Sequence, residues 1–298
     1  MDNEYEIKFC DHDSCPCGSN KKFKDCCKKD KDIYYSSNKR AVRNYENKIV
    51  MIDKNKIKNS QIELQKVVKN NLENISSIDD IKVLMSSFYE IVDIGLEEYA
   101  KYTPCKKGCH QCCNMIVWIS RPEYILIKDY ILTNFNKSKI KSIQQKINDS
   151  LKVCPSKKQM LDYYYSEEFI HGKIINGNCI DEYYKKNIPC VFLSETGACE
   201  IYEVRPLECR NYMVLSDYNN CSPFTSKREV QVYNGFIEYA NELLKVINKR
   251  LFCGKYNELQ LTGVESIQEY FKNISSDDIT MKNSFFKKVL NKFIKKEN

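Results

Sequence analysis

The stretch Cys105-Lys-Lys-Gly-Cys109-His-Gln-Cys112-Cys113 places four cysteines within nine residues, at the spacing C-x3-C-x2-C followed directly by a fourth thiol. Thiolates are preferred ligands of zinc and of iron–sulfur clusters. A second block follows at Cys190, Cys199, Cys209 and Cys221. If the predicted helices between the blocks fold back, these eight thiols suffice for two four-coordinate ions, or for one iron–sulfur cluster with spare ligands.

A third block lies near the N-terminus, where Cys15, Cys17, Cys26 and Cys27 are spaced C-x-C-x8-C-C. Two close pairs of cysteines joined by a short loop can converge on one tetrahedral zinc ion, and such an ion can fold a segment too short to bury a core. Five lysines between residues 21 and 29 would offset the negative charge of four thiolates on zinc. The block therefore predicts a zinc knuckle.

The chain of 298 residues contains 16 cysteines. Its polar, acidic opening lacks the features of a secretory signal, so we expect a cytoplasmic protein with reduced thiols. A cysteine excess there favours metal binding or catalysis over disulfides. The four cysteines outside the blocks suggest no site, and most would be small buried hydrophobic residues: Cys10, Cys154, Cys179 and Cys253.

Charge and hydropathy exclude other classes of protein. The net charge of +7 is spread along the chain, so nucleic acid is not indicated as a partner. No apolar run is long enough for a transmembrane segment. The few histidines make a thiol nucleophile a weak hypothesis: His110 could be a spare metal ligand or a solvated loop residue, His12 an alternative knuckle ligand, and His171 a residue at a helix end.

The apolar pattern predicts a mainly α fold in which irregular, cysteine-rich metal-binding loops lie on a helical frame. Residues 38–102 are expected to be helical, although 36–74 could instead be a connector, and Ser77 and Asp79 are candidate caps of the strongest helix. Residues 172–200 are expected to be loop with a small hairpin. Further helices are predicted at 121–135, starting after Ser120, and at 139–151, 156–169, 228–250 and 281–296.

We predict four segments from these patterns. They are a zinc knuckle at residues 1–30, a helical connector at 31–78, a cysteine-cluster domain at 79–255 and a basic helical tail at 256–298.

Two parts of the chain resemble known bacterial families. The segment from Cys15 to Cys27 resembles the SEC-C motif, which implies zinc binding and docking to a protein partner or an anionic surface. Residues 100–225 resemble the YkgJ-type cysteine-cluster proteins, through C-x3-C-x2-C-C and G-x-C-x-I-Y-x-x-R-P-x-x-C-R-x-Y. That resemblance implies zinc or iron–sulfur binding by Cys105, Cys109, Cys112, Cys113, Cys190, Cys199, Cys209 and Cys221.

The sequence is compatible with two roles for the protein, an adaptor and an enzyme. The flagellin lysine N-methylases, which are distantly similar, suggest a metal-dependent protein-modifying enzyme, but the chain has no recognisable methyl-donor motif. Radical S-adenosylmethionine chemistry fits poorly, because the chain is mostly helical. Arg205 and Arg210 flank Cys209 and could balance thiolate charge, although each could also be a surface arginine.

Overall fold

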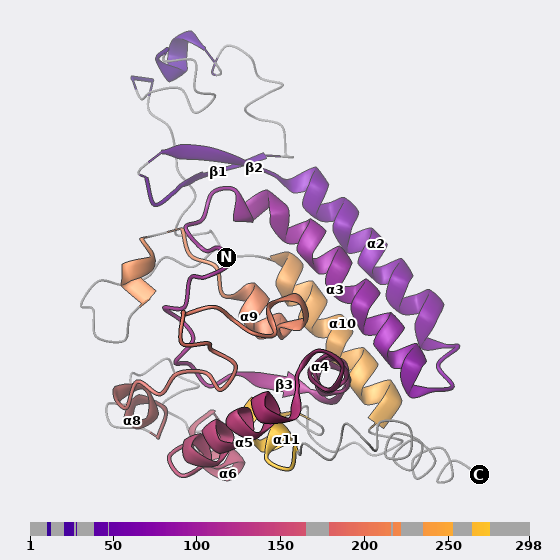
Figure 1. The fold of residues 1–298 in the computed structure, drawn as a ribbon. Coiled ribbons are helices and arrows are strands. Elements are labelled where there is room, and N and C mark those ends of the chain that lie inside the picture. Colours follow the sequence, from indigo (N-terminus) through magenta and orange to yellow (C-terminus); the bar gives the residue numbers. More distant parts are fainter. Residues whose placement is uncertain are drawn as a thin grey trace.

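The computed structural model describes residues 11–12, 21–26, 28, 39–46, 48–164, 179–215, 217–221, 235–252 and 264–274. Across these residues helices predominate and two short antiparallel sheets join them, which confirms the mainly α prediction (Figure 1). The elements in chain order are η1 (Phe23–Asp25), β1 (Lys39–Arg43), β2 (Ile49–Asp53), α2 (Lys54–Leu72), α3 (Ile78–Ala100), β3 (Trp118–Ser120), α4 (Arg121–Asn134), α5 (Lys137–Leu151), α6 (Lys157–Tyr164), α8 (Cys179–Lys185), η2 (Tyr202–Val204), α9 (Leu207–Asn211), η3 (Tyr218–Cys221), α10 (Gly235–Phe252), β4 (Val264–Ser266) and α11 (Ile267–Phe271).

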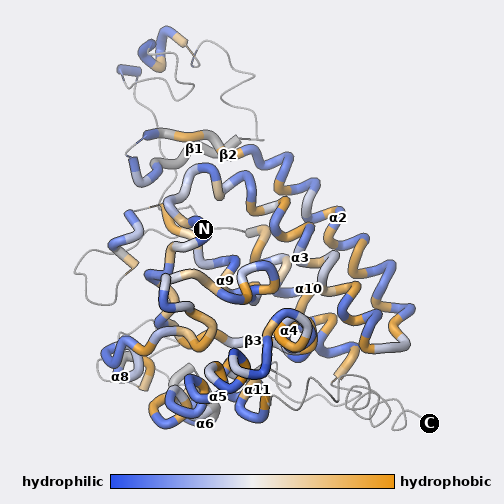
Figure 2. Tube along the Cα trace, in the orientation of Figure 1, coloured by the Kyte–Doolittle hydropathy of each residue, from blue (hydrophilic) through white to orange (hydrophobic). Residues whose placement is uncertain are grey.

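The main core lies between α2, α3 and α10, which run side by side in Figure 1. Apolar residues recur along α3 every three or four positions, so one face is apolar and the other is polar, as the alternating colours of Figure 2 show. Leu84, Phe88 and Val92 on that face are completely buried. The helices approach closely at Gly95, where an added Cβ would lie 2.3 Å from a ring atom of Phe236 on α10.

The start of α3 is fixed by a capping box. The Ser77 side chain accepts a hydrogen bond from the Asp80 backbone N–H, and the Asp80 carboxylate accepts one from the Ser77 N–H. The prediction of Ser77 as a cap is therefore confirmed. Asp79 lies within the first turn instead, where its charge favours the helix N-terminus.

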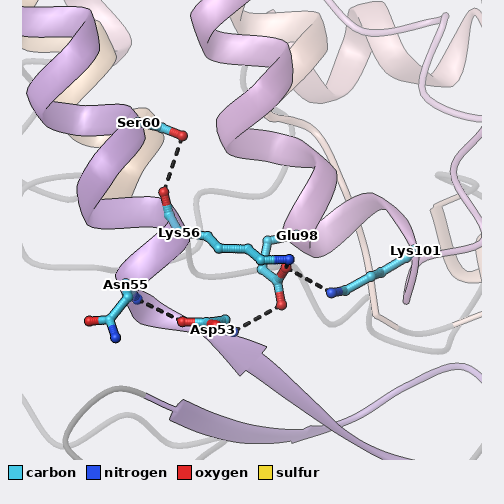
Figure 3. A network of polar contacts seen from close by, with 6 residues as sticks. All are labelled: Asp53, Asn55, Lys56, Ser60, Glu98 and Lys101. Atoms are coloured by element: carbon cyan, nitrogen blue, oxygen red, sulfur yellow. Dashed lines mark hydrogen bonds and ion pairs between the residues drawn. The ribbon is translucent and has the colours of Figure 1, made fainter.

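A polar network joins the end of α3 to the β1–β2 hairpin and the start of α2 (Figure 3). Its centre is Glu98, which is 5% exposed. One Glu98 oxygen accepts the Asp53 N–H at 2.9 Å, while the other accepts the Lys101 ammonium at 2.7 Å and lies 3.6 Å from Lys56. Asp53 in turn caps α2 through the Asn55 N–H. Glu98 thus holds the hairpin against the helix that leads into the first cysteine loop.

A second core lies below the first, where α4, α5 and α11 meet the β3–β4 ladder. Ile127, Ile140 and Phe271 are completely buried there. A third, smaller core holds α6 against α8, with Met160 and Tyr183 buried in it. Within the described ranges, no helix has both the length and the hydropathy needed to cross a membrane.

Several local predictions need correction. Residues 39–43 and 49–53 form a hairpin rather than a helix, because Ile49-Val-Met-Ile suits a strand and α2 begins only after Asp53. A short helix, α8, lies within the segment expected to be loop, where the expected hairpin amounts to one bridge between Leu193 and Cys199. Helices are confirmed at 121–134, 137–151, 157–164 and 235–252, whereas 165–169, 228–234 and 281–296 lie outside the described residues.

The structure also shows how the predicted segments contact one another. In the predicted connector, α2 packs against α3 and α10 of the predicted cluster domain. Similarly, β4 and α11 of the predicted tail pack on β3 and α5. The four segment boundaries remain predictions.

Candidate metal centre

Six of the eight cysteines of the two central blocks lie in segments that connect the helices. Four are in the 101–117 loop between α3 and β3, and Cys190 and Cys199 are in the 186–206 segment between α8 and α9. Cys209 lies on α9 and Cys221 ends η3. All eight are free thiols of intermediate exposure.

The first loop is built from consecutive tight turns. The Cys109 N–H donates to the Lys106 carbonyl, and the Cys113 N–H donates to the His110 carbonyl, both at 2.9 Å. Gly108 has a φ of +95°, in the region that residues with a side chain rarely adopt. The glycine in Gly-Cys-His therefore lets the backbone turn between the first and second cysteines.

The two loops touch at several points, two of which lie beside the cysteines. The Cys190 N–H donates to the Cys113 carbonyl at 2.5 Å. The His110 ring lies over Gly197, where an added Cβ would be 2.9 Å from Nδ1 and where φ is +78°. The turn that contains Gly197 is closed by the Ser194 N–H donating to the Ala198 carbonyl. Segments 77 residues apart in the chain are thereby joined.

Buried apolar residues anchor the second loop. Val191, Phe192 and Ile201 flank its cysteines and are buried in the second core. The Phe192 ring packs edge-on against Phe271 of α11, with centroids 5.5 Å apart. Because the apolar side chains are held inside, the cysteines between them stay near the surface of the core.

The thiols lie close enough to act on one another electrostatically. The pKa of Cys190 is raised to about 12, chiefly by burial and also by the thiols of Cys199 and Cys112. Burial also raises the pKa of Cys209 strongly, with contributions from Cys190 and Cys112. The pKa of Cys113 is raised first by its hydrogen bond with Cys112 and then by burial. These thiols from both blocks therefore share one neighbourhood.

Cys105 and Cys199 belong to the same neighbourhood. Burial raises the pKa of Cys105, and the thiols of Cys109 and Cys112 contribute to the increase. Burial also raises the pKa of Cys199, where Arg205 acts in the opposite direction. Arg205 is therefore the flanking arginine that favours a thiolate, which agrees with the charge-balancing role considered for it.

Arg210 is placed differently. Its side chain is only 2% exposed, so the hypothesis of a surface arginine is wrong for this residue. The guanidinium pairs with Asp93 of α3 and lies over the Tyr89 ring at 4.3 Å. Arg205, in contrast, packs over Tyr202 at 4.0 Å, with Lys107 on the same ring at 5.1 Å.

Two carboxylates support the site, the buried Glu123 and the more exposed Glu208, and neither was singled out from the sequence. One oxygen of Glu123 accepts hydrogen bonds from the Leu207 N–H of α9 and from the Tyr89 hydroxyl, both at 2.9 Å. Its other oxygen accepts hydrogen bonds from the N–H and the hydroxyl of Ser120, at the start of α4. Glu208 accepts the Trp118 N–H at 2.5 Å, and burial raises its pKa to about 7. The Ser120 to Glu123 spacing is a capping-box signal that could have identified Glu123, but no local pattern marks Glu208.

The donor set fits a thiophilic metal. Partly buried thiols crowd one another here, and those with a raised pKa would be unfavourable as thiolates without a nearby positive charge. A zinc or iron ion supplies that charge. Among the described residues, no three His, Cys, Asp or Glu side chains are already arranged around one point as a metal site. Cys221 lies in η3. The membership of all eight cysteines in one centre remains a prediction.

Only part of the predicted knuckle is described. Cys26 follows η1, and its N–H donates to the Phe23 carbonyl at 3.2 Å, while Cys15, Cys17 and Cys27 lie outside the described residues. Phe23 is buried, and Lys28 pairs with Asp11. Cys154 and Cys179 border the third core rather than the two loops.

Comparison with family models identifies two modules. Residues 104–231 match the CxxCxxCC family, described as "Putative zinc- or iron-chelating domain", and residues 13–29 match the SEC-C motif. Both resemblances found in the sequence are thereby confirmed. No curated protein and no solved structure gives a significant match.

Proposed function

We propose that the loops of the CxxCxxCC domain hold one thiolate-bound metal centre, made of zinc ions or of an iron–sulfur cluster. The ligands would be Cys105, Cys109, Cys112, Cys113, Cys190, Cys199 and Cys209, with Cys221 as the eighth. The observation that carries the proposal is the junction of the two loops, where the Cys190 N–H binds the Cys113 carbonyl and His110 lies on Gly197.

The surroundings of the thiols support the same function. Cys112 contributes to the raised pKa of Cys105, Cys190 and Cys209, which supports a shared site for thiols of both blocks. The metal would supply the positive charge that lets buried thiols ionise. The chain would supply the ligands, a rigid support from the second core, and Arg205 as a further cation beside Cys199.

We also propose that the protein acts as an adaptor, in which a zinc-bound knuckle of Cys15, Cys17, Cys26 and Cys27 recruits the cluster domain to a protein partner. The Glu98 network supports this role, because it fastens the hairpin that follows the knuckle to the helix before the first cysteine loop. The enzyme alternative has no observation of its own in the described residues.

The metal proposal is tested by purifying the full chain without oxygen, then measuring its metal content and visible spectrum. Cys112→Ala should remove the metal of the central loops and leave the knuckle zinc, whereas Cys17→Ala should do the reverse. Cys154→Ala is the matched control, since this half-buried thiol lies against the third core. Unchanged metal content in Cys112→Ala would contradict the proposed centre.

The adaptor proposal is tested by crosslinking the intact chain in cells and identifying the attached proteins. A partner captured by the wild type and by Cys154→Ala, but lost with Cys17→Ala, is the expected result. The same set of proteins in all three samples would overturn the role proposed for the knuckle.

A further inference from the structure

Arg210 makes four interactions at once from a fully buried position. Its Nε donates to the Arg205 carbonyl at 2.9 Å, and one terminal nitrogen donates to the Glu203 carbonyl at 2.7 Å. The other terminal nitrogen pairs with Asp93. The flat face of the guanidinium lies 4.3 Å from the centre of the Tyr89 ring. A planar fork with several donors is suited to such a set of partners, and an ammonium group is not.

These partners belong to two parts of the chain. Glu203 and Arg205 lie in the short segment between Cys199 and Cys209, whereas Asp93 and Tyr89 lie on neighbouring turns of α3. Arg210 therefore fastens the cysteine-bearing segment to the longest helix of the main core. The two carbonyls that it binds lie at the end of η2, where helical backbone bonding stops.

The opposite end of α9 is held by the same part of the frame. The Leu207 N–H donates to Glu123, which also accepts the Tyr89 hydroxyl. Tyr89 thus contacts the guanidinium with its ring and Glu123 with its hydroxyl. The five-residue helix that carries Cys209 is fixed at its first and fourth residues by buried polar contacts.

We propose that Arg210 is a positioning residue for the metal centre, which acts through its contacts with Asp93 and Tyr89 to hold Cys209 and Cys199 in place for the metal. The inference rests on the proposed metal centre. It assigns Arg210 a geometric role, distinct from the charge balance by which Arg205 acts on Cys199.

The two roles predict opposite effects of Asp93→Asn. If Arg210 acted by its charge, removing the nearby carboxylate would strengthen the positive field at the thiolates and tighten metal binding. If Arg210 acts by position, the loss of its anchor on α3 loosens α9 and weakens binding. Asp93 is half-exposed and is not a predicted ligand, so the substitution breaks the ion pair with Arg210 without removing a thiol.

The experiment uses the full chain carrying Cys17→Ala, which removes a predicted zinc ligand of the knuckle. Zinc affinity is measured by competition with a chelator, and thiolate coordination by the charge-transfer absorption of the cobalt(II) form. Asp93→Asn should weaken zinc binding about tenfold, at the lower end of the roughly 10- to 100-fold cost of losing a contact that orients a metal ligand. Asp79→Asn is the matched control, because this exposed Asp on the same helix pairs only at the surface with Lys82.

Arg210→Lys provides the second test. It keeps the positive charge but cannot bind Asp93 and two carbonyls with one planar fork, so zinc binding should weaken at least as much as in Asp93→Asn. Wild-type affinity in either variant, or tighter binding in Asp93→Asn, would overturn the positioning role and leave the metal centre intact. Lower stability of the metal-free protein with unchanged zinc affinity and cobalt spectrum would also overturn it. If the Cys17→Ala chain binds neither zinc nor cobalt(II) and holds no iron–sulfur cluster, the proposed centre itself fails.

Discussion

Gly197→Ala tests whether the contact between the two cysteine loops matters for the fold. The φ of +78° at Gly197 is in the left-handed region, which costs a residue with a side chain about 1–2 kcal/mol. Replacing glycine also restricts the unfolded chain, which offsets about 0.4–1 kcal/mol of that cost. In addition, the new Cβ would lie 2.9 Å from His110 Nδ1, so the ring must move from its place against the loop.

Gly108→Ala is the matched control. Its φ of +95° gives a similar backbone penalty, but an added Cβ would meet nothing within 4 Å. We therefore expect Gly108→Ala to cost about 1 kcal/mol, and Gly197→Ala about 1 kcal/mol more, since crowding a packed site typically costs about 1–3 kcal/mol. The difference isolates the His110 contact.

The assay is urea unfolding of the metal-free full chain, followed by zinc affinity of the same variants. Adding His110→Ala should reduce the cost of Gly197→Ala to the level of Gly108→Ala. Equal costs for the two glycine variants, or no relief from His110→Ala, would refute the reasoning that His110 and Gly197 hold the loops together.

Three further predictions concern caps, the polar network and proton release. Ser77→Ala should lower the free energy of unfolding by about 1 kcal/mol in urea titrations, because it removes the capping box of α3. Ser86→Ala, at an exposed position in the middle of the same helix, should change it little. Equal effects of the two substitutions would contradict the stabilising role of the cap. Glu98→Ala should cost about 1–3 kcal/mol in the same assay, because it leaves the partly buried Asp53 N–H without this acceptor. The exposed neighbour Glu97→Ala should be nearly neutral. A neutral Glu98→Ala would show that the network contributes no stability. The raised pKa of Cys190 and Cys209 keeps these thiols protonated at neutral pH in the metal-free protein, so zinc loading should release protons and zinc affinity should fall as the pH is lowered. Calorimetry in buffers of different ionisation enthalpy measures the number of protons released. Zinc loading without proton release would contradict the prediction.

Local signals were enough to predict most of the helices. The capping residue Ser77 and the apolar spacing from Ile81 to Tyr99 identify α3, and Ser120 with the following proline identifies the start of α4. The β1–β2 hairpin was missed because Ile49 to Ile52 is a short apolar run, which fits either a strand or a helix until its partner strand is known.

The site shows the same division between local and long-range information. Cysteine spacing identifies the two loops, because neighbouring ligands must share one ion. The sequence alone could not distinguish the roles of Arg205 and Arg210, because both flank Cys209. Only the fold shows that Arg205 lies near Cys199 and that Arg210 pairs with Asp93. The role of Glu208 could not be predicted from sequence either, because its hydrogen-bond partner Trp118 is 90 residues away in the chain.

The central claim is that the two cysteine loops bind metal through thiolates. X-ray absorption at the edge of the bound metal, recorded on the full chain with Cys17→Ala to remove the knuckle contribution, tests it most directly. The account predicts a first coordination shell dominated by sulfur, at about 2.3 Å if the metal is zinc. A shell of oxygen or nitrogen atoms without sulfur would contradict it.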